Sequence, residues 1–397
     1  MQDFTPTRIA ALERLNAFVP KAGRDYSAKR NYDVAGHPHV SGLSPYIRHR
    51  VLTEGEVLDA TLSRFWPSTA DKFIQEVYWR TYWKGWLELR PAVWDRYQTQ
   101  LTSAYQSLES NDRLKNDVYD ALNGQTGIDC FDHWARELQE TGYLHNHARM
   151  WFASIWIFTL RLPWVLGADF FLRHLLDGDP ASNTLGWRWV AGIQTRGKTY
   201  LARPDNIARY TEGRFTPSGL AQIAPPLDEP DPGPAGTVPI SQPPLRGAKT
   251  AILLHYEDLS PTALMRGEHR AAAVLKPREQ SGPSHASENV LAFRKALTDD
   301  AAARYGLSAA PHLSANDIAN WAEKDGIEQI VTAYAPVGPV AEELCQLERQ
   351  LHSKGITLSR QLRAHDTLCW PHATKGFFKF KEKIPQFLKA RRATTAA

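Results

Sequence analysis

The sequence predicts a multi-domain protein in which an all-helical domain is followed by an α/β domain with a parallel sheet. Its 397 residues exceed the usual length of one domain. Before residue 220 the apolar residues recur at helical spacing, and after residue 247 short apolar runs alternate with helical stretches. We therefore expect a helical domain over residues 1–220, a proline-rich linker over 221–246 and a Rossmann-like α/β domain over 247–390.

The first region is predicted to be a series of amphipathic helices. Residues 5–19 predict the first of these helices, with Thr5 or Thr7 as its cap. Its apolar face, Ile9, Leu12, Leu15 and Val19, recurs near a 3.6-residue period. Gly142 and Gly178 are expected to end two later helices. The apolar run 150–160 is too short to span a bilayer and predicts a buried helix.

The linker and the second region differ sharply in composition. Eight of the 26 prolines lie between Pro225 and Pro244, in a segment almost without large apolar residues, which predicts an extended linker. Beyond it, strands are expected in 250–259 and 271–277, and a helix in 287–306. Residues 318–336 and 340–362 each predict a helix followed by a strand, which completes a parallel, doubly wound sheet. No GxGxxG or GxxxxGK[ST] motif is present to indicate a nucleotide site.

Composition limits the class of protein. The net charge of +4 is weak evidence for an anionic partner. Three unpaired cysteines and the lack of an apolar signal segment favour a cytoplasmic protein without membrane segments. Eleven of the thirteen tryptophans precede residue 190, which favours a stacking or recognition surface in the helical region over a merely aromatic core.

The string GYLHNHARM contains two histidines that resemble a metal motif. On a helix His145 and His147 point about 200° apart, and no cysteine or carboxylate lies nearby at ligand spacing, so we expect no metal. Arg149 precedes the apolar run and needs a partner, which Asp177 or Asp179 can supply as an ordinary structural ion pair. The DGDPASN segment around those aspartates lacks the ligands of a calcium loop.

Three stretches together are more specific. They are FIQEVYWRTYW (73–83), NGQTGIDCFDHWARELQETGYLHNHARMWFAS (123–154) and FFLRHLLDGDPASNTLGWRWVAG (170–192). In order and spacing they resemble the FAD-binding domain of the DNA photolyase and cryptochrome family, and LSPYI (43–47) resembles that family's phosphate-binding loop. The resemblance runs from about residue 5 to residue 210.

The resemblance implies a bound FAD. Arg149 would pair with Asp177 beside the isoalloxazine ring, Asp179 would lie at its polar edge, and Asn183 would face the flavin N5. Asparagine at the last position is typical of the repair branch of the family. The complete cofactor-binding set implied in this way is Tyr26, Ser41, Leu43, Ser44, Arg80, Arg149, Asp177, Asp179 and Asn183.

The resemblance also implies a pocket for a flipped pyrimidine dimer. Aromatic side chains stack on an extruded base, and a carboxyl and an amide hydrogen-bond its edges. The residues at these positions are Glu76, Trp79, Asn146, Met150 and Trp189, with His147 at the DNA surface. Trp187 and Trp164 match two members of the family's electron relay. The third position falls near Asn111, so Trp94, Tyr97, Tyr105 or Trp151 would have to replace it, or the relay is shortened.

The implied function is blue-light-driven repair of cyclobutane pyrimidine dimers in UV-damaged DNA by electron transfer from reduced flavin. The catalytic residues would be Glu76, Asn146, Asn183, Trp187 and Trp164. One alternative is a cryptochrome-like photoreceptor that binds FAD without repair, and another is a scaffold that is not photoactive. Val40 and Gly42 in the phosphate loop and His147 depart from the family pattern and leave these alternatives open.

The order of the domains departs from the family as well. Family members begin with an antenna domain, whereas here AILLHYEDLSP (251–261), which resembles its first strand, follows the helical region. Residues 365–387 resemble the segment that leads from the antenna domain into the helical one. We expect a circular permutation, with an unrelated α/β domain as the alternative. An antenna chromophore remains unassigned, and a monomer is expected.

Overall fold

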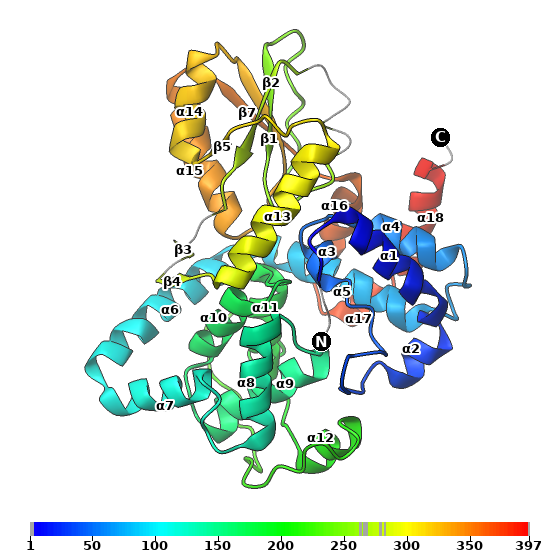
Figure 1. The fold of residues 1–397 in the computed structure, drawn as a ribbon, viewed down its shortest axis with the longest axis vertical. Helices are drawn as coiled ribbons and strands as arrows, with labels where there is room; N and C mark the ends of the chain where they lie inside the picture. Colours follow the sequence, from blue (N-terminus) through cyan, green and yellow to red (C-terminus); the bar gives the residue numbers. More distant parts are fainter. Residues whose placement is uncertain (1–3, 262–263, 265–268, 278–279, 282, 396–397) are drawn as a thin grey trace.

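The molecule consists of a helical part and an α/β part that lie against each other (Figure 1). This computed structural model describes residues 4–261, 264, 269–277, 280–281 and 283–395. No helix among these residues is long and apolar enough to cross a membrane.

The helical part confirms the predicted all-helical first region, since no strand is assigned in residues 4–249. Its long aromatic helix α5 (Asp71–Glu88) lies centrally, between the N-terminal helices and the C-terminal ones. The other helices are α1 (Arg8–Phe18), α2 (Arg24–Lys29), α3 (Ser44–Arg48), α4 (Glu54–Leu62), α6 (Ala92–Ser110), α7 (Asp112–Leu122), α8 (Asp129–Thr141), α9 (Asn146–Ser154), α10 (Trp164–His174), α11 (Pro180–Val190) and α12 (Pro204–Tyr210).

Helix α1 begins as predicted, and three of the four residues expected on its apolar face lie inward: Leu15 and Val19 are buried, and Leu12 packs against the core. The Thr7 side chain caps it by accepting a hydrogen bond from the Ala10 amide. Ile9, expected on the buried face, is 70% exposed. Ala11 and Phe18 complete the buried stripe, and the phenylalanine fills the core against Tyr26 and Phe73.

The two glycine-terminated helices behave differently. Gly142 ends α8 with φ 67°, in the left-handed conformation that glycine adopts without strain, as predicted. The prediction for Gly178 is wrong, because α10 ends at His174 and Leu175 already has extended backbone. The Leu176 amide donates to the Gly142 carbonyl over 2.8 Å, so the ends of the two helices are joined. This junction brings Asp177 next to α9.

The α/β part confirms the predicted parallel, doubly wound sheet. Its strand order is β5-β2-β1-β6-β7, and every pairing in it is parallel. Helix α13 lies on the face toward the helical part, while α14 and α15 cover the other face (Figure 1). The short β5 and the β3–β4 pair were not predicted. The elements are β1 (Thr250–Leu254), β2 (Ala271–Leu275), β3 (Gln280–Ser281), β4 (Ser284–His285), α13 (Glu288–Arg304), β5 (His312–Leu313), α14 (Ala315–Lys324), β6 (Gln329–Ala333), α15 (Pro339–Ser353) and β7 (Thr357–Gln361).

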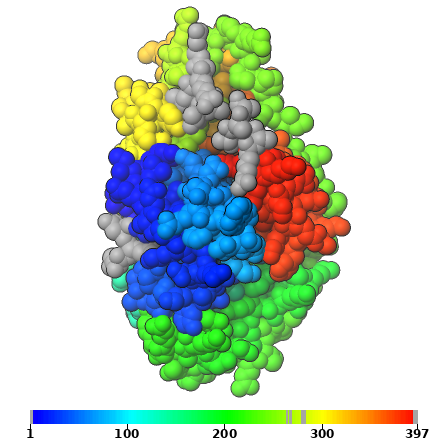
Figure 2. Space-filling model, turned by 90° about the vertical axis from the view of Figure 1, so that its right-hand side faces the viewer, coloured from blue at the N-terminus to red at the C-terminus, as the bar shows by residue number. Residues whose placement is uncertain are grey.

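The C-terminal helices return to the helical part, although the expected boundary assigned residues up to 390 to the α/β domain. They are α16 (Ala364–Cys369), the 3₁₀ turn η4 (Trp370–His372), α17 (Phe377–Lys381) and α18 (Ile384–Thr395). Their apolar side chains join the core around α5. A Cβ at Gly85 of α5 would lie 2.7 Å from the Trp370 ring, so this glycine permits the close approach of η4. Figure 2 shows the C-terminal residues, in red, beside the blue N-terminal helices.

The linker contains no helix or strand, as predicted, but it is attached to both parts of the molecule. The Gly236 amide donates to the Leu89 carbonyl over 2.8 Å, and the Leu245 amide donates to Gln329 Oε1 over 2.8 Å. Glu229 forms an ion pair with the buried Arg188 of α11. These contacts fix the path of the chain from the helical part to the sheet.

Candidate functional site

Arg149 and Asp177 form the ion pair that the sequence predicted. Arg149 Nη2 donates to Asp177 Oδ2 over 2.9 Å, while its Nε donates to the Leu144 carbonyl. The guanidinium also lies over the ring of Tyr143, 5.5 Å from its centre. Asp177 Oδ1 is buried and accepts no hydrogen bond from any described residue. The pair is therefore rigid and leaves one buried acceptor for a further donor.

Asp179 begins α11 and lies at the centre of a group of cations. Its Oδ1 accepts hydrogen bonds from the amides of Ala181 and Ser182, as an N-cap does. Its Oδ2 lies 3.1 Å from Lys84 Nζ and 3.3 Å from Arg80 Nη1. Burial by itself would raise the pKa of Asp179, but Lys84, Arg80 and Arg48 outweigh it and hold that pKa well below its usual range. Asp179 is therefore ionised.

This group continues into the α/β part as a buried ionic network. Glu257, just after β1, accepts hydrogen bonds from Arg48 over 2.6 and 2.7 Å and approaches Lys84 Nζ to 3.4 Å. The network contains five cations and five carboxylates, so its charges balance: Arg48, Arg50, Arg80, Lys84 and Arg363 with Glu54, Asp179, Glu257, Asp258 and Asp366. Sequence analysis missed it, although charged residues inside the apolar stretch PYIRHRVL were a signal.

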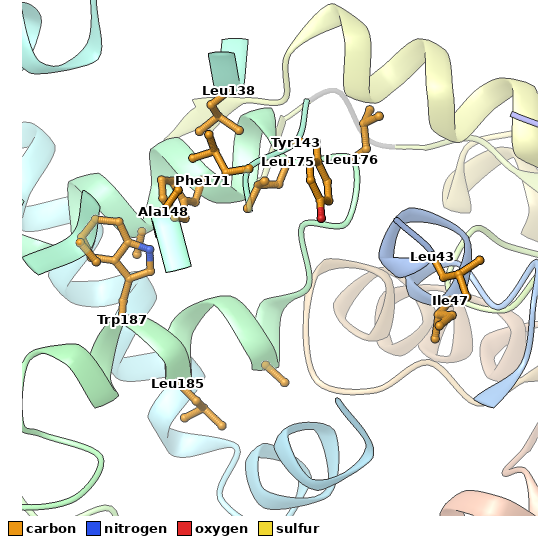
Figure 3. Packing of buried hydrophobic residues seen from close by; sticks show 14 of the residues in the cluster. Leu43, Ile47, Leu138, Tyr143, Ala148, Phe171, Leu175, Leu176, Leu185 and Trp187 are labelled. Carbon is orange, nitrogen blue, oxygen red and sulfur yellow. The ribbon is translucent and has the colours of Figure 1, made fainter. Parts of the chain in front are cut away.

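Asn183 and Trp187 lie on one helix, α11, four residues apart. The Asn183 side-chain amide donates to the Ala168 carbonyl over 2.7 Å, which fixes its orientation against α10. Trp187 packs edge-on against Phe171, with ring centres 5.2 Å apart, and Figure 3 shows this packing. Its buried indole N–H has no hydrogen-bond partner among the described residues. A buried donor without an acceptor is unusual in plain core packing.

Trp164 lies on a different aromatic path from Trp187. The ring of Trp164 is 5.7 Å from that of Tyr97, which is 5.3 Å from that of Trp94. No ring contact joins Trp164 to Trp187 in the described part of the chain. Asn111, at the third relay position, is an exposed N-cap of α7, and a cavity of about 760 Å³ borders Trp164 and Leu114. Of the replacements considered, Tyr97 is the one in contact with Trp164.

The predicted phosphate loop precedes the short helix α3. Ser41 Oγ accepts a hydrogen bond from the Leu43 amide over 3.3 Å, and Ser44 is exposed at the first turn. Gly42 has φ 60°, a conformation that disfavours the larger residues usual in the family's loop. Tyr26 is buried, and its ring packs edge-on against Phe73, 5.2 Å away.

Two of the expected lesion contacts have partners within the protein. Glu76 is paired with Arg30 of the α2 C-terminus, while burial raises the pKa of Glu76. Trp79 is stacked on Phe377 of α17, with ring centres 3.6 Å apart and an angle of 12° between the planes. One face of Trp79 is therefore occupied, and its ring also lies 5.2 Å from the ring of Trp83, at an angle of 35°. Neither partner was predicted from the sequence.

The remaining expected lesion contacts are more accessible. Asn146, at the first position of α9, is exposed, and its amide lies 3.9 Å from Met150 Sδ one turn later. Met150 is partly buried, as is Trp189, whose ring is 5.7 Å from Tyr200. The pairing of Asn146 with Met150 places both side chains on one face of α9, as predicted.

The histidine pair is part of a stack of rings. His145 is the N-cap of α9, and its carbonyl accepts the i,i+4 hydrogen bond from the Arg149 amide over 3.0 Å. The His147 ring lies between Trp151 and Tyr210, at 5.3 and 5.4 Å, and its Nδ1 contacts the Asn31 carbonyl. Burial lowers the pKa of His147, so the ring is neutral. A contact of His147 with a DNA phosphate stays a prediction, and the stacked, neutral ring does not favour it.

No group of three or more potential metal ligands occurs among the described residues.

Known proteins match the helical part. Residues 73–215 match the family model described as the FAD binding domain of DNA photolyase. A deoxyribodipyrimidine photo-lyase of Alkalihalophilus pseudofirmus is 31% identical over 196 residues, which cover 48% of this chain and 39% of that protein. The Escherichia coli enzyme of the same name is 29% identical over 210 residues, 40% of its length. The matched part thus spans about two fifths of these relatives.

A solved bacterial class III photolyase from Agrobacterium tumefaciens has a TM-score of 0.43 and 26% identity, covering 52% of this chain and 45% of that one.

FAD is the cofactor of the matched domain, as expected from the sequence. The residues at the site fit it in two respects. The Arg149–Asp177 pair keeps a buried carboxylate oxygen without a donor, and Trp187 keeps a buried N–H without an acceptor. Asp179 differs, because three cations of the chain already neutralise it.

Proposed function

We propose that this protein is a light-driven DNA repair enzyme, because residues 73–215 match the FAD binding domain of DNA photolyase. Its substrate would be a cyclobutane pyrimidine dimer in UV-damaged DNA. The observation that carries the proposal is the Arg149–Asp177 pair with its unsatisfied buried oxygen. Arg149 lies on α9 with the accessible Asn146 and Met150, and Asp177 lies six residues before Asn183.

The chain's own residues would hold the cofactor as follows. Arg149 and Asp177 would bind beside the isoalloxazine ring, and Asp179, held in place by Arg80 and Lys84, would lie at its polar edge. Asn183, oriented by the Ala168 carbonyl, presents its side-chain oxygen. The remaining contacts would come from Tyr26, Ser41, Leu43 and Ser44. Reduced FAD, when bound, supplies the electron that light transfers to the dimer.

The lesion would be held at the accessible edge of the site. Trp79 and the partly buried Trp189 would stack on the flipped bases. Asn146 would hydrogen-bond a pyrimidine edge, and Met150 would pack beside it. Glu76 would do the same once released from Arg30, and its burial raises the pKa of the carboxyl. Trp187, and Trp164 through Tyr97, would return electrons to the cofactor.

The test measures flavin absorbance and blue-light repair of a duplex with one thymine dimer, before and after chemical reduction of the protein. We expect repair by the wild-type protein and a loss of at least about tenfold in Asn146→Ala, since a hydrogen bond to a charged or developing charge contributes about 1.5–3 kcal/mol. Tyr119→Phe, an exposed change on α7, is the matched control. Flavin without repair in the reduced wild-type protein would exclude the enzyme and leave the photoreceptor.

We also propose that the domain order arose by circular permutation. The support is the return of α16–α18 to α5, which gives the helical part a segment from the far end of the chain. A permuted protein that begins near residue 247 and ends near residue 240, with the present termini linked, should therefore fold and bind FAD. Cytoplasmic location and a monomeric state stay predictions.

A further inference from the structure

A short segment near the C-terminus presents basic and aromatic side chains to solvent. It consists of Lys375, Phe378, Lys379, Lys381 and Lys383, and we refer to it as the α17 surface. Phe378 is 78% exposed, so its whole ring is available to a partner next to these lysines. Lys375, Lys379 and Lys383 are exposed as well, and Lys381 is partly so.

The neighbouring residue Phe377 fixes the position of this surface. Its buried ring stacks on Trp79 at 3.6 Å and packs edge-on against Tyr82 at 5.5 Å. The Tyr82 hydroxyl also donates to the Lys375 carbonyl over 2.9 Å. Because the backbone of α17 is held at both points, Phe378 points outward from a rigid support. Such preorganisation reduces the entropy lost when the ring binds a partner.

The charge of this region differs from that of the rest of the chain. Residues 375–391 contain six basic side chains and one acidic one, a net charge of +5, against +4 for the whole chain. Lys379 contacts that acid, Glu382, over 2.9 Å, but both side chains are more than half exposed, so the pair is weak. Lys381 approaches Asp71 only to 4.0 Å. The α17 surface therefore attracts a polyanion.

We propose that the α17 surface binds duplex DNA beside the lesion, with the lysines on phosphates and Phe378 inserted into the gap that the flipped dimer leaves. This inference rests on the proposed function, since it needs a dimer to be extruded next to Trp79. Apolar wedges of this kind stabilise unstacked base steps, while lysine–phosphate contacts position the protein on the backbone. Trp79, locked by Phe377, joins the wedge to the lesion pocket.

An anionic membrane is the other partner that basic and aromatic residues attract. Helix α17 has only five residues, and its buried side chains Phe377 and Phe380 pack against α5 and α18. One exposed phenylalanine provides much less apolar area than an interfacial helix needs. DNA therefore fits the α17 surface better.

The test is dark equilibrium binding, measured by fluorescence anisotropy at several salt concentrations. The probes are a duplex with one thymine dimer, the undamaged duplex and a single-stranded dimer oligonucleotide. We expect Phe378→Ala to weaken binding of the damaged duplex about tenfold, because a wedge offsets an unstacking cost of a few kcal/mol. Binding of the single strand should change less than about twofold, since it has no duplex gap to fill.

The double variant Lys379→Gln/Lys383→Gln should weaken both duplexes and lower the slope of log K against log salt by about two. Ile240→Ala, 89% exposed in the linker, and Arg113→Gln, 93% exposed on α7, are the matched controls. Unchanged flavin absorbance verifies that each variant is folded.

If Phe378→Ala and the wild type bind the damaged duplex with equal affinity, the wedge is overturned. The proposed function still holds in that case, provided that the wild type repairs the dimer. A wild-type protein that neither binds nor repairs the dimer removes both. If the wild type binds vesicles of phosphatidylcholine and phosphatidylserine and Phe378→Ala abolishes that binding, the partner of the α17 surface is a membrane and the DNA proposal is overturned.

Discussion

At the scale of single residues, the surroundings of His37 change its charge state. Its ring contacts Asp33 and Glu137 at 3.3 and 3.1 Å, meets the Tyr143 ring edge-on and is stacked on the His145 ring, with ring centres 6.0 Å apart. Burial by itself would lower the pKa of His37, but the two carboxylates outweigh burial and raise that pKa to about 9. Burial lowers the pKa of His145 to about 3, so that neighbour stays neutral. His37 is therefore a buried cation at neutral pH.

This residue makes the stability of the protein depend on pH. Because the folded pKa lies above the unfolded value of about 6.5, the stabilisation is complete below pH 6.5 and is lost as the pH rises through 9. The shift corresponds to about 3 kcal/mol. His37→Asn should remove this dependence while tolerating the φ of 47°. Urea unfolding at pH 6.5, 8 and 9.5 measures it, and parallel profiles for wild type and variant would contradict it.

At the scale of elements, helices α10 and α11 meet through a glycine. A Cβ at Gly167 would lie 2.3 Å from the Trp187 ring and 2.9 Å from the Trp156 ring, both buried. Gly167→Ala should therefore lower the free energy of unfolding by about 1–3 kcal/mol through overpacking. Gly186→Ala is the matched control on α11, because its Cβ meets nothing within 4 Å, and it should stabilise by up to about 1 kcal/mol. Equal midpoints in urea for the two variants would show that Trp187 is not packed against α10.

Elements were also where prediction from sequence succeeded best. The αL position of Gly142 and strands β1, β2, β6 and β7 follow from local chemistry and apolar period, which a sequence carries directly. The end of α10 at His174 could not be predicted in this way. The loop that follows it is shaped by a hydrogen bond from the Leu176 amide to the distant Gly142 carbonyl.

The candidate site shows the same division. The Arg149–Asp177 pair was predictable, since a motif holds both residues at fixed spacing. The surroundings of this pair were not predictable, because they come from distant parts of the chain. Glu257 lies 209 residues from its partner Arg48, and Phe377 lies 298 residues from its partner Trp79. Contacts at such separations have no local signal in a single sequence. What the sequence could have indicated was only that Arg48 and Arg50, within an apolar stretch, needed anionic partners.

At the scale of the whole molecule, the chain before the linker and the chain after it are joined by buried ion pairs as well as by covalent continuity. Glu257 binds Arg48, and Asp366 binds Arg50 over 2.7 Å, both fully inside the protein. Removing one partner of such a pair costs about 3–5 kcal/mol, since it leaves an uncompensated buried charge. The helices α16–α18 add an apolar contact across the same boundary. The linker adds hydrogen bonds to both sides, from the Gly236 amide to the Leu89 carbonyl and from the Leu245 amide to Gln329 Oε1, and the ion pair of Glu229 with Arg188.

Cleavage of the linker should therefore leave the molecule assembled. A protease site inserted at Ile240, which is 89% exposed, would cut the chain without touching either contact. We expect the fragments to co-elute in size-exclusion chromatography at pH 7 and to separate in acid. The lysine and arginine partners hold the pKa values of Asp179, Glu257 and Asp258 below their usual range despite burial. The stabilisation from these carboxylates is thus present above about pH 4 and is lost as the pH falls.

The same cut in a Glu257→Gln background separates the ionic contribution from the apolar one. With Arg48 and Lys84 left without this carboxylate, the fragments should dissociate at a higher pH or a lower urea concentration than the cleaved wild type. Asp117→Asn, which affects only an exposed pair with Arg113 at 3.9 Å, is the control and should change nothing. Fragments that part at pH 7 in the wild-type background would mean that the linker holds the two parts together, and the buried network would then be a consequence of that proximity.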